Sequence, residues 1–213
     1  MVHVPYRPGK IVCVGRNYAA HARELGNPMP ERPLLFLKPP SAVIGDGEAI
    51  VLPAASQQVE HEGEVGVVIG TRLRQADERA ARAAIAGLAC VNDVTARDLQ
   101  KADGQWTRGK GFDTFCPVGP VVPIGAEVDL QALDVVCRVN GAVRQHGHVA
   151  DMAFPIPFLL SYISAIMTLE PGDLVATGTP EGVGPLRAGD VVEVEIPGFS
   201  VLRNPVEVLV VGR

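Results

Sequence analysis

Short runs of β-branched and other apolar residues recur along this chain, separated by its 23 glycines and 18 prolines. Such runs are typical of strands, and the Gly- and Pro-rich segments between them are typical of turns. The dipeptide Asn140-Gly141 predicts a tight hairpin, and residues 187–190 (RAGD) predict a second turn. The predicted strands cover residues 10–15, 34–38, 64–70, 87–94, 133–141, 173–178, 190–196 and 206–212.

Helices are predicted in four places. Residues 17–25 begin with Asn17, a residue type that commonly caps a helix, and end before a glycine. Residues 77–86 are amphipathic and rich in alanine and arginine, and residues 95–101 follow a predicted strand. Residues 156–167 are apolar, which predicts a buried helix.

Length and composition indicate one soluble globular domain. The chain has 213 residues and no internal repeat or linker, so we expect a single domain over residues 1–213, of α+β, β-rich class. A formal net charge of −5 provides no basic surface for nucleic acid or an anionic membrane. No apolar run approaches the roughly 20 residues that span a bilayer, and the N-terminus lacks the apolar core of a signal peptide. The four isolated cysteines are expected to be buried thiols in a reducing compartment, which predicts a cytoplasmic protein.

Three glutamates alternate with other residues in the segment VEHEGEVGVVIG, residues 59–70. On a strand, side chains two positions apart point to the same face, so Glu60, Glu62 and Glu64 would share one face. Their Cα atoms would follow one another at about 6.5 Å, close enough for the carboxylates to meet on Mg²⁺, Mn²⁺ or Ca²⁺. A solvated strand face explains the same pattern. The residues alone leave both interpretations open.

Three other segments carry side chains suited to catalysis or binding. Asp93 ends a predicted strand, where an acid either caps the next helix or takes part in chemistry. His21 and Glu24 are three apart on a predicted helix, so they form either a surface pair or a general base with its orienting carboxylate. Lys110, between two glycines, lies either in a polar surface loop or against a substrate carboxylate or enolate. Residues 176–184 (ATGTPEGVG) lack the spacing of a phosphate-binding loop, so we discount a nucleotide site there.

Taken together and in this order, the segments resemble the fumarylacetoacetate hydrolase family, in its short single-domain branch. The resemblance extends over nearly the whole chain, through VGRNYAAHARELG, PLLFLKPPSAVIG, VEHEGEVGVVIG, CVNDVTARDLQ, WTRGKGFDTFCPVGP, VNGAVRQ and LVATGTPEGVGP. It implies a mixed β-sheet roll that commonly forms a homodimer and binds Mg²⁺ or Mn²⁺. The eponymous enzyme carries an additional N-terminal domain, whereas this chain begins almost directly at VGRNY. We therefore expect a reaction other than the eponymous one.

The resemblance also implies roles for particular residues. Glu62, Glu64 and Asp93 match the metal ligands, which leaves Glu60 outside the ligand pattern, either solvated or beside the ligands. The His–Glu pair that is the base in hydrolytic members is matched by His21 and Glu24. The substrate contacts of the family are matched by Arg16, Arg97, Gln100, Lys110 and Thr179, of which Lys110 is a catalytic lysine. A further lysine of the family, whose role is undefined, is matched by Lys38.

A small 2-oxo acid is the substrate that the resemblance implies. A metal ion would stabilise the enolate that hydrolysis, decarboxylation and isomerisation of such acids share. Because His21 and Glu24 can activate water, we expect C–C hydrolysis of acylpyruvates, with decarboxylation of oxaloacetate as a side or main activity. Isomerisation or tautomerisation of 2-hydroxy-dienoates or of oxaloacetate is one alternative, and a non-catalytic 2-oxo-acid-binding protein is another. Specificity is expected to arise from loops at residues 26–33 and 142–150.

Overall fold

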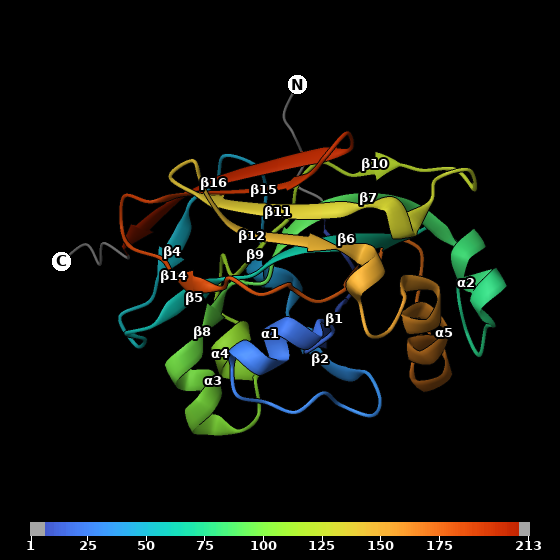
Figure 1. The fold of residues 1–213 in the computed structure, drawn as a ribbon, viewed down its shortest axis with the longest axis horizontal. Helices are drawn as coiled ribbons and strands as arrows, with labels where there is room; N and C mark the ends of the chain where they lie inside the picture. Colours follow the sequence, from blue (N-terminus) through green and yellow to red (C-terminus); the bar gives the residue numbers. More distant parts are fainter. Residues whose placement is uncertain (1–6, 209–213) are drawn as a thin grey trace.

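Two large β-sheets form the centre of the part of the chain that the structure describes (Figure 1). The structure is a computed structural model that describes residues 7–208 of the 213-residue chain. The first sheet has the strand order β10 (Val122–Pro123), β7 (Ile85–Asn92), β6 (Gly63–Ile69), β13 (Leu174–Ala176), β1 (Ile11–Gly15) and β2 (Leu34–Lys38). The second has the order β12 (Ala142–His148), β11 (Asp134–Val139), β15 (Val191–Ile196), β16 (Ser200–Val208) and β4 (Ile50–Leu52).

Two small sheets complete the strand arrangement. One joins β14 (Gly184–Pro185), β5 (Val59–His61) and β8 (Thr95–Ala96), and the other pairs β3 (Val43–Ile44) with β9 (Cys116–Pro117). The pairs β1–β13, β16–β4 and β3–β9 are parallel, whereas the other paired strands are antiparallel. The expectation of a β-rich fold with mixed sheets is confirmed.

The helices are short and fall into two groups (Figure 1). The helices α1 (Ala19–Glu24), α3 (Arg97–Asp103) and α4 (Thr107–Lys110) lie on one side of the sheets. The helices α2 (Glu78–Ala83) and α5 (Ile156–Ile166) pack against each other at one end. Single-turn 3₁₀ helices cover Pro40–Ala42, Leu130–Ala132 and Val149–Asp151. Within residues 7–208, no helix is long and apolar enough to cross a membrane.

The central strand β6 is buried at every position, because its sheet is covered on both faces. Val65 and Val67 belong to the core between the two large sheets. Val68 belongs to a second apolar cluster on the other face. Since side chains alternate along a strand, Glu64 points away from the main core, to the same side as Val68. This alternation directs one of the predicted metal ligands towards the helices α1, α3 and α4.

Both predicted turns are present. Asn140 and Gly141 adopt positive φ angles of 53° and 78° and join β11 to β12, as a two-residue hairpin requires. The turn at residues 187–190 is closed by a hydrogen bond from Asp190 N to Arg187 O at 3.0 Å. The eight predicted strands all overlap observed ones. The last strand begins at Ser200, earlier than predicted, and positions 209–212 of that prediction lie outside the described residues.

Two helix boundaries were predicted wrongly because strand pairing overrides the local helix signal. The predicted helix 77–86 ends at Ala83, since Ile85 already pairs with Ile69 in the first large sheet. The predicted helix 95–101 begins only at Arg97, because Thr95 and Ala96 pair with β5.

The other two helices differ in capping and burial. Asn17 is not the cap of α1, which begins after Tyr18. Its amide instead donates to Thr177 O at 2.9 Å and its carbonyl accepts from Phe154 N at 2.9 Å, so it ties three segments together. The helix α5 is only partly buried, and Ile166 at its end is 57% exposed.

Candidate active site

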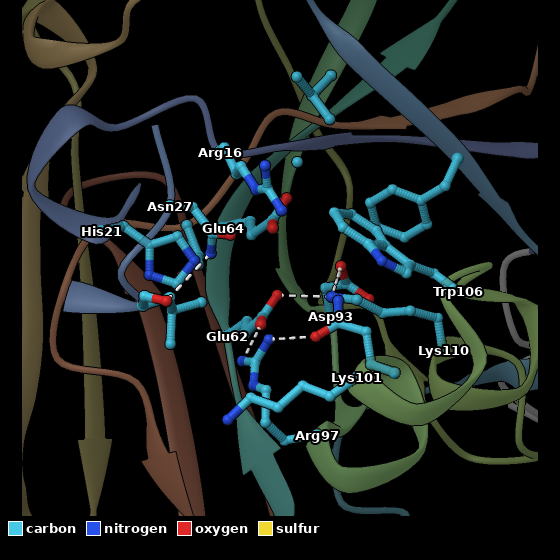
Figure 2. A pocket seen from close by; sticks show the side chains of 17 residues that line it. Arg16, His21, Asn27, Glu62, Glu64, Asp93, Arg97, Lys101, Trp106 and Lys110 are labelled. Carbon is cyan, nitrogen blue, oxygen red and sulfur yellow. Dashed lines mark hydrogen bonds and ion pairs between the residues drawn. The ribbon is translucent and has the colours of Figure 1, made fainter. Parts of the chain in front are cut away.

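A cavity of about 400 Å³ lies between the first large sheet and the helices α1, α3 and α4 (Figure 2). Its wall contains nine of the ten residues predicted to act on metal or substrate: Arg16, His21, Glu62, Glu64, Asp93, Arg97, Gln100, Lys110 and Thr179. Glu24, the tenth, lies behind His21 and does not line the cavity. Residues spread over most of the sequence are therefore brought to one place.

Three carboxylates form the floor of the cavity because of the register between β6 and β7. Gly63 pairs with Asn92, so Glu62 and Asp93, one position outside that pair, are also opposite each other. Asp93 N donates to Glu62 O at 2.8 Å, and Asn92 Oδ1 accepts from Glu62 N at 2.9 Å. One oxygen each of Glu62, Glu64 and Asp93 lies within 4.8 Å of the other two, and all three residues are buried.

Two buried lysines neutralise part of this negative charge. Lys110 Nζ donates to Glu62 Oε2 at 2.7 Å and to Asp93 Oδ2 at 2.6 Å. Lys38 Nζ donates to Asp93 Oδ1 at 2.6 Å and to Val94 O at 3.1 Å. The structure thus gives Lys38, whose role the resemblance left undefined, a definite place beside Asp93.

Glu60 lies on a different strand from Glu64, because the segment that contains the three glutamates forms two strands, β5 and β6. The strand β5 ends at His61 and β6 begins at Gly63, so the three glutamates do not lie on one continuous strand as predicted. Glu60 and Glu62 nevertheless face the same side, because both contact Arg97. Glu60 is buried and accepts a hydrogen bond from Arg97 Nε at 2.8 Å, which excludes a solvated position. Arg97 also pairs through Nη2 with Glu62 and donates from Nη1 to Gln100 Oε1 at 2.7 Å.

The two neighbouring glutamates of the cluster differ in their electrostatic surroundings. Burial opposes ionisation of Glu62, but the positive charges of Lys110 and Arg97 hold its pKa well below the usual range. Burial, together with the negative charges of Asp93 and Glu62, raises the pKa of Glu64 well above its usual range. Glu62 is therefore an anion with its own cationic partners, whereas Glu64 is a carboxyl group whose ionisation needs further positive charge.

The donor set fits a hard divalent cation. In the described part of the chain, Glu64 has no ion-pair partner and accepts one hydrogen bond, from Gly178 N at 2.8 Å. Gly178 has a φ of +102°, a conformation that favours glycine and that aims this N–H at the carboxylate. Clustered carboxylate oxygens are the ligands that Mg²⁺ and Mn²⁺ prefer. A cation held by Glu62, Glu64 and Asp93 would supply the positive charge that Glu64 lacks.

His21 and Glu24 form the predicted pair on α1. His21 is 4% exposed and lines the cavity, on the side opposite Trp106 and Lys110 in Figure 2. Its Nδ1 lies 3.4 Å from Glu24 Oε2, and Glu24 Oε1 accepts from Gly182 N at 3.0 Å. The carboxylate is thus anchored on one side and faces the imidazole on the other, which leaves His21 Nε2 as the ring nitrogen available for proton transfer.

Aromatic residues that were not predicted from the sequence form the wall beside Arg16. The guanidinium carbon of Arg16 lies 5.9 Å from the centroid of the Trp106 ring, within the range of a cation–π contact. Trp106 meets Phe36 edge-on at 5.1 Å. A Cβ atom on Gly15 would lie only 2.7 Å from the Trp106 ring, so the indole requires glycine there. The available sequence signal was that Trp106 is the chain's single tryptophan and lies next to the segment TRGKG.

The hydroxyl group of Thr179 is already engaged within the protein. It donates to Gly63 O at 2.9 Å and accepts from Gln145 Nε2 at 2.7 Å. Of the two segments predicted to set specificity, residues 26–33 contribute Asn27 to the cavity wall. Residues 142–150 do not form a loop over the cavity, since Ala142–His148 is strand β12. Lys101 was also missed as a lining residue.

The chain belongs to the fumarylacetoacetate hydrolase family, since the family model described as "Fumarylacetoacetate (FAA) hydrolase C-terminal" matches residues 10–207. Among its relatives is the mitochondrial oxaloacetate tautomerase FAHD1 of Arabidopsis thaliana, 46% identical over 97% of this chain and 95% of that protein. Another is the mitochondrial oxaloacetate decarboxylase of Dictyostelium discoideum, 45% identical over 90% of each. The predicted family is thereby confirmed.

A solved structure supports the same assignment. The 5-carboxymethyl-2-hydroxymuconate delta-isomerase from Mycobacterium smegmatis is 45% identical, with a TM-score of 0.88 over 98% of this chain and 82% of that one. Proteins of this family are therefore named for at least three reactions, namely tautomerisation, decarboxylation and isomerisation.

Proposed function

We propose that this protein is an enzyme that acts on small 2-oxo acids through an enolate of the substrate, with Mg²⁺ or Mn²⁺ as its cofactor. The observation that carries the proposal is the cluster of Glu62, Glu64 and Asp93, which forms the floor of a cavity that also contains His21. The names of the relatives support oxaloacetate as a substrate, by decarboxylation or tautomerisation. The His21–Glu24 pair supports C–C hydrolysis of acylpyruvates as the second candidate.

The three carboxylates would hold the cation, and the surrounding positive residues keep them in place. When bound, the ion would polarise the keto group of a 2-oxo acid and lower the energy of negative charge that develops on its oxygen. Arg97 fixes Glu62 between itself and Lys110. Lys38 fixes Asp93 through its second oxygen. We assign Arg97 a positioning role, because its three guanidinium nitrogens already contact Glu60, Glu62 and Gln100.

Arg16 is the cation best placed to bind a substrate carboxylate. Within the described residues its guanidinium makes no hydrogen bond or ion pair, and it is held at the cavity wall by the Trp106 ring. An arginine of this kind binds a carboxylate through two parallel hydrogen bonds. Lys110 presents a second positive charge towards the cavity from the other side of Glu62, where negative charge on a substrate oxygen would be stabilised.

His21 is assigned the proton transfers. Glu24 faces Nδ1, which favours a proton there and leaves Nε2 free to accept one. In tautomerisation or isomerisation, Nε2 would take a proton from the carbon next to the keto group and return it at another atom. In hydrolysis, Nε2 would remove a proton from water as it attacks the distal carbonyl carbon. Decarboxylation needs only proton delivery to the enolate carbon after CO₂ leaves.

The test is a substrate panel with the wild-type protein and a His21→Gln variant. Oxaloacetate, acetylpyruvate and a 2-hydroxy-dienoate are each assayed with saturating Mg²⁺ or Mn²⁺, with pyruvate formation and loss of enol absorbance as readouts. We expect turnover of oxaloacetate or acetylpyruvate, and a loss in His21→Gln of about 10²–10⁴-fold for hydrolysis with a much smaller loss for decarboxylation. Absence of turnover of every substrate by metal-loaded protein would overturn the proposal. Equal losses for hydrolysis and decarboxylation would contradict the role given to His21.

The family resemblance extends the proposal to the state of the protein in the cell. We propose a cytoplasmic homodimer, which light scattering coupled to size-exclusion chromatography would detect as a mass of twice the 22.5 kDa chain. A monomeric mass at micromolar concentration would contradict this part of the proposal.

A further inference from the structure

Two histidines and an aspartate form a second group of possible metal ligands, on the hairpin of β11 and β12 and away from the cavity. His146 and His148 are two positions apart on β12, and both are exposed. Gln145, which precedes them, and Gly147, which lies between them, are buried. The register of the hairpin places Asp134 directly opposite His148. All three side chains therefore emerge on the outer face of the second large sheet.

The side chains already converge on one point. His148 Nδ1 lies 2.5 Å from Asp134 Oδ1, and His146 Nε2 lies 3.3 Å from Asp134 Oδ2. The two imidazole rings lie 5.0 Å apart between centroids. One donor atom from each of the three residues lies within 4.8 Å of the other two. Ligands at metal bonds of 2.0–2.2 Å stand about 3–3.5 Å from one another, so small side-chain rotations suffice to complete the geometry.

From this arrangement we propose that Asp134, His146 and His148 bind a borderline divalent transition-metal ion, of the class of Zn²⁺, Ni²⁺ or Cu²⁺. Two imidazoles and one carboxylate are a donor set that such ions prefer and that Mg²⁺ does not. The set contrasts with the all-carboxylate cluster of the cavity. The two sites would thus select different metals within one chain, and the proposal does not depend on the proposed function.

The contact between Asp134 and His148 affects the pKa of both groups. The hydrogen bond to Asp134 raises the pKa of His148, so a metal ion would have to displace a proton from this imidazole. Partial burial opposes ionisation of Asp134, but hydrogen bonds with His148 and His146 lower its pKa below the usual range. The carboxylate is therefore an anion at neutral pH, as a ligand must be. The ion would replace the contacts between Asp134 and the histidines. Because β12 is the edge strand of its sheet, an ion held across β11 and β12 would stabilise that edge in the native state.

The test is calorimetric titration of the full chain with Zn²⁺ in excess Mg²⁺, with a His146→Ala/His148→Ala variant and a Val143→Ala control. Val143 is exposed on the same hairpin and offers no ligand. We expect the double variant to bind one equivalent of Zn²⁺ fewer, or to bind it roughly tenfold or more weakly, while the control matches the wild type. Turnover with Mg²⁺ is expected to be unchanged in the double variant, since neither histidine lines the cavity. Equal Zn²⁺ binding by the wild type and the double variant would overturn the proposal.

A second measurement uses only the wild-type protein and the single variant Asp134→Asn. In electron paramagnetic resonance, Cu²⁺ bound at this site is expected to show hyperfine coupling to two imidazole nitrogens. Asp134→Asn should retain this nitrogen coupling and bind Cu²⁺ more weakly, because the amide carries no charge. A spectrum of the first equivalents of Cu²⁺ without coupling to two nitrogens would also overturn the proposal.

Discussion

Gln145 donates a hydrogen bond from Nε2 to the hydroxyl of Thr179 at 2.7 Å, although neither residue is near the other in sequence. The same amide nitrogen donates to Pro180 O at 2.8 Å. The side-chain oxygen of Gln145, Oε1, accepts from Gly63 N at 2.9 Å. Gly63 lies between two of the proposed ligands, so this one buried side chain links the ligand strand β6 to the loop that forms the cavity edge. Gln145 itself does not line the cavity.

Replacement of Gln145 by alanine is therefore expected to affect both stability and catalysis. The variant loses at least three buried hydrogen bonds and leaves Gly63 N unpaired, so we expect the free energy of unfolding to fall by about 3 kcal/mol. The rate constant kcat should fall because Gly63 and Thr179 are no longer held in register. Urea unfolding and steady-state kinetics provide the measurements. The exposed Gln131 serves as the control, and a Gln145→Ala protein with the stability and kcat of Gln131→Ala would refute the linking role.

Features of the fold that depend on local sequence could be predicted, whereas contacts between distant segments, such as those of Gln145, could not. Strand positions followed from runs of β-branched residues, and the Asn140-Gly141 hairpin followed from the conformational preference of these two residues. Both are local properties. The juxtaposition of Glu62 with Asp93 was identified through resemblance, and its physical cause is the register of β6 on β7, which no local pattern encodes.

The predictions that were wrong share one cause, namely contacts between segments that are distant in the sequence. Residues 77–86 and 95–101 have helical character, but pairing with other strands removed the end of the first helix and the start of the second. Asn17 had the side chain of a helix cap, yet it binds backbone groups of Phe154 and Thr177. The alternating glutamates correctly predicted strand structure in this segment. The interruption between β5 and β6 at Glu62 depends on the pairing of β5 with β8 and β14, which the local sequence does not encode.

Glu60 and Glu62 are expected to respond differently to removal of charge, even though both contact Arg97. Glu62→Gln loses a proposed ligand, so Mn²⁺ binding should become undetectable. Glu60→Gln keeps the ligands and only weakens the support of Arg97, so we expect Mn²⁺ affinity to fall by about tenfold. Calorimetric titration with Mn²⁺ measures both, with the exposed Glu31→Gln as a control. Equal loss in the two variants would mean that Glu60 belongs to the ligand set.

The four cysteines are expected to be unreactive in the native protein. Cys13, Cys90, Cys116 and Cys137 are all free and fully buried, as predicted, although only three of them have apolar sequence surroundings and Cys116 lies near polar residues. Burial raises the pKa of Cys90, of Cys116 and of Cys137 to about 12, and it raises the pKa of Cys13 well above its usual range. Since the thiolate is the reactive form, a disulfide reagent at pH 8 should modify none of them within minutes. It should modify all four in guanidinium chloride. Rapid native labelling of even one thiol would contradict this prediction.

The stability contributed by Asp98 is expected to depend on pH. Partial burial opposes its ionisation, but hydrogen bonds from Ser56 Oγ at 2.6 Å, Gln57 N at 2.8 Å and Leu99 N lower its pKa below the usual range. These bonds join the loop before β5 to the first turn of α3, the helix that begins with Arg97.

The sign of the effect follows from linkage between protonation and folding. Because the pKa of Asp98 is lower in the folded than in the unfolded state, the unfolded state binds more protons between the two values. The contribution is therefore complete above the unfolded pKa, roughly 3.9, and is lost as pH falls through the folded pKa. We expect Asp98→Asn to be less stable than wild type by about 1 kcal/mol at pH 7, and the difference to shrink below about pH 4. Urea unfolding at both pH values measures it, with the exposed Asp113→Asn as a control for general charge effects. A difference that grows as pH falls would mean that Asp98 is bound more favourably in its protonated form.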